Sequence, residues 1–170
     1  NESSLGMSDS AKEASTNALA GAARYPDKHR ATLLSKVAAL NGVSENQVLL
    51  GNGSIESIRA VVQMLHDKAL KTDTRFQLII PDPTFGCAEL YARSLDIPVV
   101  KVPLTRDDYD LDFDNLQKAA AQFDGISLFY LCNPNNPTAI MTETATLKAW
   151  IKNAPKNHYF LVDEAYFGYI

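Results

Sequence analysis

The sequence predicts an α/β fold in which a mainly parallel sheet carries helices on both faces and is preceded by a helical N-terminal arm. Short apolar runs alternate with longer amphipathic stretches, which is typical of parallel strands joined by helical crossovers. The runs are almost continuously apolar, as in strands that are buried on both faces. Two amphipathic stretches precede the first run, and these predict the arm.

The individual elements follow from the apolar periodicity. It predicts helices over Ser8–Ala22 and His29–Leu40, and Asn41-Gly42 is a typical C-terminal stop for the second. With no long linker or repeat, we divide the chain into the arm and its helices, residues 1–42, and an α/β domain, residues 43–170. In that domain we expect strands at Gln47–Leu50, Phe76–Ile80, Pro98–Val102, Ile126–Leu131 and His158–Val162, and helices at Ser54–Leu70, Phe85–Leu95, Asp112–Phe123 and Thr142–Asn153.

The composition excludes several classes of function. A formal net charge of -4 provides no basic surface for nucleic acid or for an anionic membrane. No apolar run approaches the roughly 20 residues of a membrane helix, and the first residues do not form a signal peptide. Cys87 and Cys132 are too few for a disulfide framework and lack metal-type spacing, so we expect a reducing cytoplasm.

Ligands of open α/β sheets bind at the carboxyl ends of the strands, so the loops that follow the predicted strands are the candidate site. The first loop reads Gly51-Asn52-Gly53-Ser54-Ile55. Its glycines free the backbone, and the N–H groups and dipole of the helix that follows can hold a phosphate. A plain turn capped by Ser54 is the alternative. The loop lacks the Lys-Ser/Thr of a P-loop and the third glycine of a dinucleotide fingerprint.

Two further loops combine proline with side chains suited to binding. Pro83-Thr84-Phe85 brings an aromatic ring to the start of a helix, where it can stack on a flat ligand or simply join the core. The loop Asn133-Pro134-Asn135-Asn136-Pro137-Thr138 restricts the chain and offers amide donors and acceptors, although Asn-Pro is also a common turn.

The last loop places Asp163 at the carboxyl end of a buried strand, with Tyr166 three residues later. A carboxylate in such a place needs a partner. A protonated pyridine nitrogen, a lysine, an arginine or a divalent metal such as magnesium would serve. The remaining alternative is that Asp163 and Glu164 form a surface pair.

No other residues indicate a metal site. His29, His66 and His158 are scattered without ligand spacing, and we expect them at the surface or at a strand edge. The acidic stretch from Asp107 to Asp114 lacks the glycine and the glutamate of a calcium loop, so it predicts a solvated turn that caps the helix from Asp112.

Taken together, these segments resemble the fold-type-I pyridoxal-phosphate (PLP) enzymes, in particular the histidinol-phosphate aminotransferase-like group of the class I/II aminotransferases. The resemblance implies the large domain of that fold, in incomplete form, and PLP as the cofactor. It is carried by the order and spacing of Arg24-Tyr25-Pro26-Asp27, Gly51-Asn52-Gly53-Ser54, Pro83-Thr84-Phe85, Asn133-Pro134-Asn135-Asn136-Pro137-Thr138 and Asp163-Glu164-Ala165-Tyr166.

The resemblance also implies a role for each site residue. Phe85 would stack on the pyridine ring, and Asp163 would pair with the protonated ring nitrogen. Asn136 and Tyr166 would share the 3-oxygen of the ring. The cofactor phosphate would be held by Gly53, Ser54 and the amide of Ile55, and Tyr25 would reach the phosphate of the neighbouring subunit in a homodimer.

The resemblance departs from the family at several points. Ile55 stands where an acidic residue is frequent, Ala139 where glycine is usual, and Ala88 where a second aromatic is frequent. No lysine follows the last predicted strand, so the aldimine lysine, which is also the catalytic base, is absent and no catalytic residue is predicted in this chain. We therefore expect a fragment of a longer enzyme, whose first strand and sheet edges lack partners, or a chain whose partner segment is supplied by another chain.

The expected reaction is amino-group transfer between an amino acid or amine, of histidinol-phosphate type, and a 2-oxo acid. A PLP-dependent decarboxylase of an amino-acid phosphate is the alternative within the same fold. A truncated α/β module without catalytic activity is the alternative from a different class. A Ser-x-x-Lys segment downstream would exclude that module.

Overall fold

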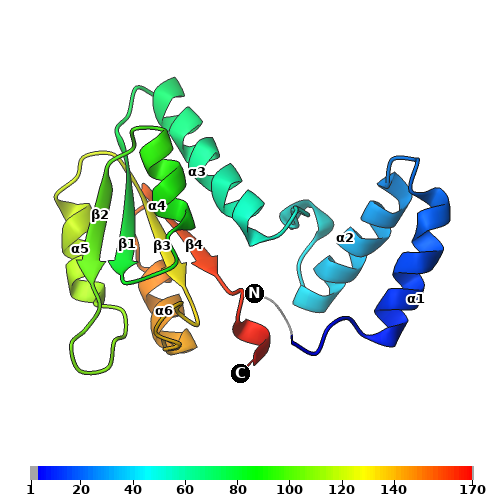
Figure 1. Cartoon of the computed structure of the whole chain (residues 1–170). Helices are drawn as coiled ribbons and strands as arrows, with labels where there is room; N and C mark the ends of the chain where they lie inside the picture. Colours follow the sequence, from blue (N-terminus) through cyan, green and yellow to red (C-terminus); the bar gives the residue numbers. More distant parts are fainter. Residues whose placement is uncertain (1–3, 170) are drawn as a thin grey trace. The chain divides into compact units, whose positions relative to one another are not determined.

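The computed structural model describes residues 4–169, apart from the side chain of Lys28, and divides into two compact units, Asn1–Leu50 and Gly51–Ile170. The first unit is helical (Figure 1). The Ser8 hydroxyl accepts from the Ala11 N–H at 3.3 Å and caps the first helix. Gly42, with φ 64°, is the C-cap of the second helix, Asp27–Asn41, which confirms the predicted stop. The elements are α1 (Asp9–Ala18), η1 (Leu19–Gly21), α2 (Asp27–Asn41) and η2 (Glu45–Gln47).

The predicted strand over Gln47–Leu50 is wrong. Ser44 and Gln47 form a capping box that starts the short helix η2, so the apolar run begins inside a helical turn. Val48 is extended after that turn, but residues 48–50 form no strand ladder in the described structure. An apolar run becomes a strand only when a neighbouring chain segment accepts its backbone hydrogen bonds. The division into domains at residues 42 and 43 stays a prediction.

The second unit confirms the predicted α/β class. Its described residues contain one sheet of four strands in the order β2-β1-β3-β4, and all neighbouring strands are parallel. Each strand is followed by a helix or by the final turn, as expected for crossover connections. The elements are α3 (Ser54–Lys71), β1 (Phe76–Asp82), α4 (Cys87–Ser94), β2 (Val99–Pro103), α5 (Phe113–Ala121), β3 (Ile126–Cys132), α6 (Thr144–Lys152), β4 (His158–Asp163) and η3 (Phe167–Tyr169).

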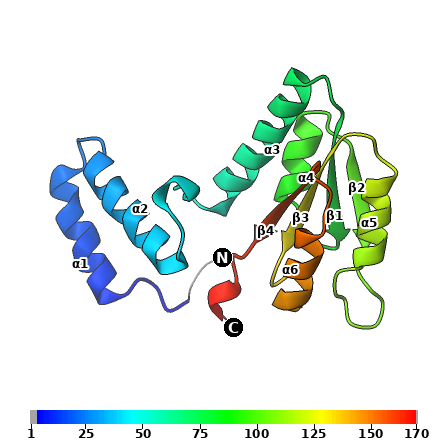
Figure 2. The ribbon, with the colours of Figure 1, turned by 180° about the vertical axis from the view of Figure 1, so that it is seen from behind.

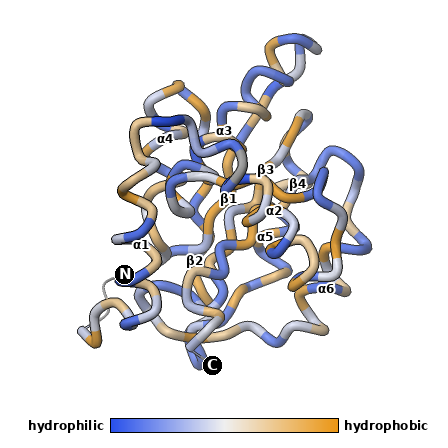
Figure 3. Tube along the Cα trace, turned by 90° about the vertical axis from the view of Figure 1, so that its right-hand side faces the viewer, coloured by the Kyte–Doolittle hydropathy of each residue, from blue (hydrophilic) through white to orange (hydrophobic). Residues whose placement is uncertain are grey.

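Helices cover both faces of the sheet (Figures 1 and 2). One core packs α3 and α4 against alternate residues of the strands, including Leu78, Leu128 and Tyr130. The other core packs α5 and α6 against the intervening residues, including Ile79 and Phe129. The apolar stretches that fill these cores stand out along the chain in Figure 3. This alternation decides which side chains of a strand face α3 and α4, and therefore which can meet at the strand ends.

The acidic stretch before α5 is a cap, as predicted. The Asp112 carboxylate accepts from the Asn115 N–H at 3.0 Å, so it satisfies a free donor at the helix start. Within the described residues there is no cluster of three or more potential metal ligands. None of the described helices combines the length and the apolar character that a membrane span requires.

His158 gives the structure a predictable pH dependence. Burial lowers the pKa of His158, and its Nδ1 has no hydrogen-bond partner within the described structure. The unfolded chain therefore takes up a proton at higher pH than the folded chain, so the free energy of unfolding falls as the pH drops below about 6.5. We expect His158→Phe to reduce this fall, measured by urea titrations at about pH 7.5 and about pH 5.5. An equal fall in the variant would contradict this assignment.

Candidate functional site

Asp163 is the last residue of β4, and its carboxylate is buried, with 7% of the residue exposed. The Tyr130 hydroxyl donates to Oδ2 at 2.8 Å, and the Ala165 N–H donates to Oδ1 at 3.1 Å. Both donors are neutral. Among the described residues, no lysine, arginine or histidine forms an ion pair with Asp163. Its neighbour Glu164 is exposed, so the two do not form a surface pair.

The groups around Asp163 respond to its negative charge. Burial raises the pKa of the Cys87 thiol, and the charge of Asp163 raises it further. The same two causes raise the pKa of Cys132, although hydrogen bonds with the backbone of Asn136 and with the side chain of Tyr130 partly oppose them. Burial raises the pKa of Tyr130 far above its ordinary value, and the hydrogen bond to Asp163 adds to this effect. These neighbours therefore stay protonated and neutral at physiological pH, and none of them balances the carboxylate.

Asn135 joins the loop after β1 to the loop after β3. Its Oδ1 accepts from the Thr84 hydroxyl at 2.8 Å, and its Nδ2 donates to the Pro83 carbonyl at 3.1 Å and to the Thr138 hydroxyl at 3.0 Å. These three bonds use both Nδ2 hydrogens and one lone pair of Oδ1 within the protein. Asn135 therefore holds the two loops together, whereas its neighbour Asn136 is half-buried.

Asn136 and Tyr166 lie together at a pocket. The Asn136 amide donates to the Tyr166 hydroxyl at the long distance of 3.5 Å, so the contact is weak and both groups can accept another partner. The pocket has a volume of about 340 Å³ and is lined by Pro134, Asn135, Asn136, Pro137, Ala139, Tyr166 and Tyr169. It lies where the loop after β3 meets the turn after β4.

The start of α3 presents backbone donors. Its N-cap is Gly53 rather than Ser54, with φ 81°, a conformation that glycine adopts without strain. No side chain caps this helix end. Glu56 accepts instead from the backbone and side chain of Asn52, ahead of the helix. The first N–H groups of α3, which have no intrahelical acceptors, therefore remain open to an anion.

Phe85 and Tyr25 occupy different parts of the structure. Phe85 lies two residues before α4 rather than at its start, is half-buried, and packs against the same core cluster as Tyr130 and Cys132. It thus shares the face of the sheet on which Asp163 meets Tyr130. Tyr25 belongs to the other unit, where it is exposed just before α2. Within the described residues, no hydrogen bond links Ser54 or Ile55 to the other predicted site residues.

Tyr130 was missed by reasoning from the sequence, because it lies in an apolar run. Its role becomes visible only from the register in which β3 pairs with β4. Tyr130 pairs with Leu161, so its side chain is on the same face as the side chain two residues further along β4, which is Asp163. The sequence places Asn135 only within a polar loop, and no local pattern indicates that it bridges to Pro83 and Thr84.

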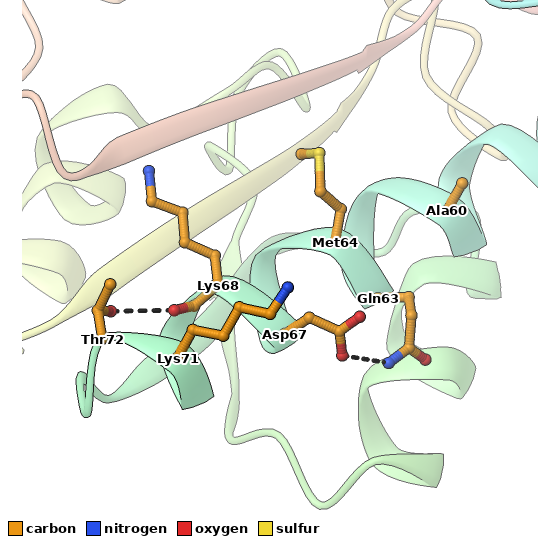
Figure 4. A pocket seen from close by; sticks show the side chains of 7 residues that line it. All are labelled: Ala60, Gln63, Met64, Asp67, Lys68, Lys71 and Thr72. Carbon is orange, nitrogen blue, oxygen red and sulfur yellow. Dashed lines mark hydrogen bonds between the residues drawn. The ribbon is translucent and has the colours of Figure 1, made fainter.

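A second pocket lies on the surface of α3 (Figure 4). It is lined by Ala60, Gln63, Met64, Asp67, Lys68, Lys71 and Thr72, and its volume is about 610 Å³. Its polar groups already bond to one another: Gln63 donates to Asp67 at 2.9 Å, and Thr72 donates to the Lys68 carbonyl at 3.0 Å. The Lys68 ammonium contacts the Tyr159 hydroxyl. This surface lies away from the strand ends and contributes nothing to the candidate site.

Ala139 stands in the pocket loop with φ 59°, a left-handed conformation that costs an L-residue roughly 1–2 kcal/mol. Glycine avoids this cost but loses more backbone entropy on folding. We expect Ala139→Gly to raise the free energy of unfolding by up to about 1 kcal/mol in a urea titration. In the matched variant Ala149→Gly, inside α6, the same change should lower stability by about 1 kcal/mol. A decrease in both variants would show that Ala139 is not strained.

Comparison with known proteins gives a consistent result. The sequence model of the family described as "Aminotransferase class I and II" matches residues 1–170. The chain is 35% identical to the histidinol-phosphate aminotransferase of Synechococcus sp. (strain JA-3-3Ab) over 146 residues, which are 86% of this chain and 39% of that protein.

Two solved structures resemble the fold. A structure from Erwinia carotovora atroseptica is 37% identical, with a TM-score of 0.87, over 100% of this chain and 47% of that one. The histidinol-phosphate aminotransferase of Sinorhizobium meliloti, solved in complex with pyridoxal-5'-phosphate, is 21% identical, with a TM-score of 0.83, over 98% of this chain and 43% of that one. The chain spans less than half the length of each of these proteins.

Proposed function

Because the chain belongs to the aminotransferase class I and II family, we propose that it forms the cofactor-binding part of a PLP-dependent enzyme that moves an amino group between an amino acid or amine and a 2-oxo acid. The amino donor that we propose is of histidinol-phosphate type, the substrate class named for the Synechococcus relative.

The buried Asp163 carboxylate is the observation that carries the proposal. A carboxylate removed from water needs a cationic partner, and the described residues supply only the neutral donors Tyr130 and Ala165. In the described part of the chain, no group of three acidic, histidine or cysteine side chains surrounds the site, so a metal there would need most of its ligands from elsewhere. The protonated ring nitrogen of PLP carries a positive charge and one N–H group, which can donate a hydrogen bond to this carboxylate.

The remaining predicted residues fit the other parts of the cofactor. The open N–H groups at Gly53, Ser54 and Ile55 would bind its phosphate. Phe85 would stack on the ring, and Asn136 with Tyr166 would hydrogen-bond its 3-oxygen, since their mutual contact is weak. When bound, PLP supplies an electron sink for the charge left on the substrate carbon after its proton leaves. Asp163 would sustain this sink by holding the proton on the ring nitrogen.

The quaternary and cellular context is part of the proposal. Tyr25 is exposed and lies in the other unit, which supports a role for it at the phosphate of a neighbouring subunit in a homodimer. Residues 1–42 would then act as the arm of the enzyme and residues 43–170 as part of its large domain. Both described cysteines are free thiols, which supports a cytoplasmic location.

The experiment that tests this function uses the full-length gene product. Its intact mass is measured with added PLP, before and after borohydride reduction, and its activity is measured as the amino product formed from histidinol phosphate and a 2-oxo acid. A gain of one phosphopyridoxyl group on reduction, together with amino transfer, would support the proposal. A protein without a specific adduct and without transfer would reject it in favour of a non-catalytic module, and release of carbon dioxide from an amino-acid phosphate would indicate the decarboxylase.

A further inference from the structure

Tyr130 lies in the middle of β3 and is completely buried, with 0% of the residue exposed. Its side chain faces α3 and α4 and belongs to the core cluster on that side. Its hydroxyl nevertheless reaches the carboxyl end of the neighbouring strand, where it donates to Asp163 Oδ2 at 2.8 Å. A buried tyrosine hydroxyl needs a hydrogen-bond partner, and the register of β3 with β4 supplies this one.

The direction of this hydrogen bond is fixed. Burial and the adjacent carboxylate both favour the protonated form of Tyr130, so its pKa is raised and the hydroxyl remains a donor at physiological pH. Asp163 therefore remains the acceptor. A phenylalanine at position 130 would keep the packing of the ring and would remove this donor, together with the interaction of the hydroxyl with the Cys132 thiol.

The two oxygens of Asp163 are held from different elements. Oδ2 accepts from Tyr130 on β3, and Oδ1 accepts from the Ala165 N–H in the turn after β4. Rotation of the carboxylate about its last bond would break both hydrogen bonds. Each oxygen has a second lone-pair direction, so the carboxylate can still accept a further donor in the orientation that these two contacts impose.

We propose that Tyr130 is a positioning residue whose hydroxyl holds the Asp163 carboxylate in the orientation that receives the protonated ring nitrogen of PLP. This inference rests on the proposed function. A carboxylate that is already oriented binds a cation without first losing rotational freedom, which is the advantage of preorganised sites. Tyr130 would act only through Asp163 and would not itself touch the cofactor.

The test compares two ligands on the full-length gene product: PLP, and its carbocyclic analogue in which a CH group replaces the ring nitrogen. Dissociation constants are measured for the wild type, for Tyr130→Phe, and for Tyr159→Phe. The last variant removes a hydroxyl from the same face of the sheet, one that contacts Lys68 and not Asp163. Loss of one hydrogen bond to a charged group predicts PLP binding about tenfold weaker in Tyr130→Phe, with the analogue unaffected. Tyr159→Phe should change neither constant.

An Asp163→Asn variant distinguishes failure of this inference from failure of the proposed function. If Tyr130 acts through Asp163, adding Tyr130→Phe to Asp163→Asn should cause no further loss of PLP affinity. If Tyr130→Phe weakens the binding of PLP and of the analogue equally, its role is merely structural and the inference is overturned. Unchanged PLP binding in Tyr130→Phe would also overturn the inference. If Asp163→Asn weakens PLP binding while Tyr130→Phe does not, the inference alone fails. A wild type that binds no PLP would reject both the inference and the proposed function.

Discussion

Replacement of Asp163 by asparagine is expected to lower kcat/KM for amino transfer by about a hundredfold or more, because removing one partner of a buried ion pair costs roughly 3–5 kcal/mol. Asparagine keeps the size of the side chain and one acceptor oxygen, so it can accept from Tyr130 or from Ala165 but not from both, and it removes the charge. The neutral amide cannot balance a protonated ring nitrogen. Steady-state kinetics of the full-length gene product and its dissociation constant for PLP measure the effect.

Glu164→Gln is the matched control for this variant. It also neutralises one carboxylate, but Glu164 is exposed and lies directly after β4, outside the buried site. We expect its kcat/KM to stay near that of the wild type. Similar losses in both variants would mean that the overall charge of this turn matters and that Asp163 has no specific partner.

Phe129→Ala is expected to produce the largest change in stability, about 3–5 kcal/mol of the free energy of unfolding. Phe129 is completely buried at the centre of the sheet. Its ring stacks on Phe160, with centroids 5.0 Å apart and planes inclined by 8°, and contacts Trp150 edge-on at 5.1 Å. Truncation would remove these contacts and leave a cavity between β3, β4 and α6. A urea titration followed by circular dichroism measures the loss.

Phe167→Ala makes the same truncation in η3, where the side chain is 53% exposed. We expect it to change stability by no more than about 0.5 kcal/mol, as is usual for substitutions outside the core. A small loss for Phe129→Ala, close to that of Phe167→Ala, would contradict the packing of the core on the α5 and α6 face.

Most of the second unit could be predicted from the sequence, because its strands are apolar runs separated by helices with clear periodicity. The family could also be predicted from its ordered motifs, and the family match confirms it. Strand ends were less predictable. β1 continues past the predicted Ile80 through Pro81 and Asp82, which pair with Val102 and Pro103, because proline lacks only the N–H and its carbonyl can still take part in a ladder.

Other features depended on contacts between distant segments. The run at Gln47–Leu50 has the composition of a strand, but composition cannot supply the neighbouring backbone that a strand needs. The pairing of Tyr130 with Asp163 depends on the register of two strands separated by α6. The bridge from Asn135 to Pro83 and Thr84 spans two loops. The cofactor contacts of Gly53, Ser54, Ile55, Phe85, Asn136, Asp163, Tyr166 and Tyr25 stay predictions.

The strand order β2-β1-β3-β4 has a consequence for folding during synthesis. β1 leaves the ribosome first, and β2 can pair with one of its edges as soon as it emerges. β3 then adds to the other edge of β1, and β4 adds to the free edge of β3. Each new strand therefore finds an edge that has already formed, and none has to be inserted between two paired neighbours. The sheet of this unit can grow in the order of translation, from the N-terminus to the C-terminus.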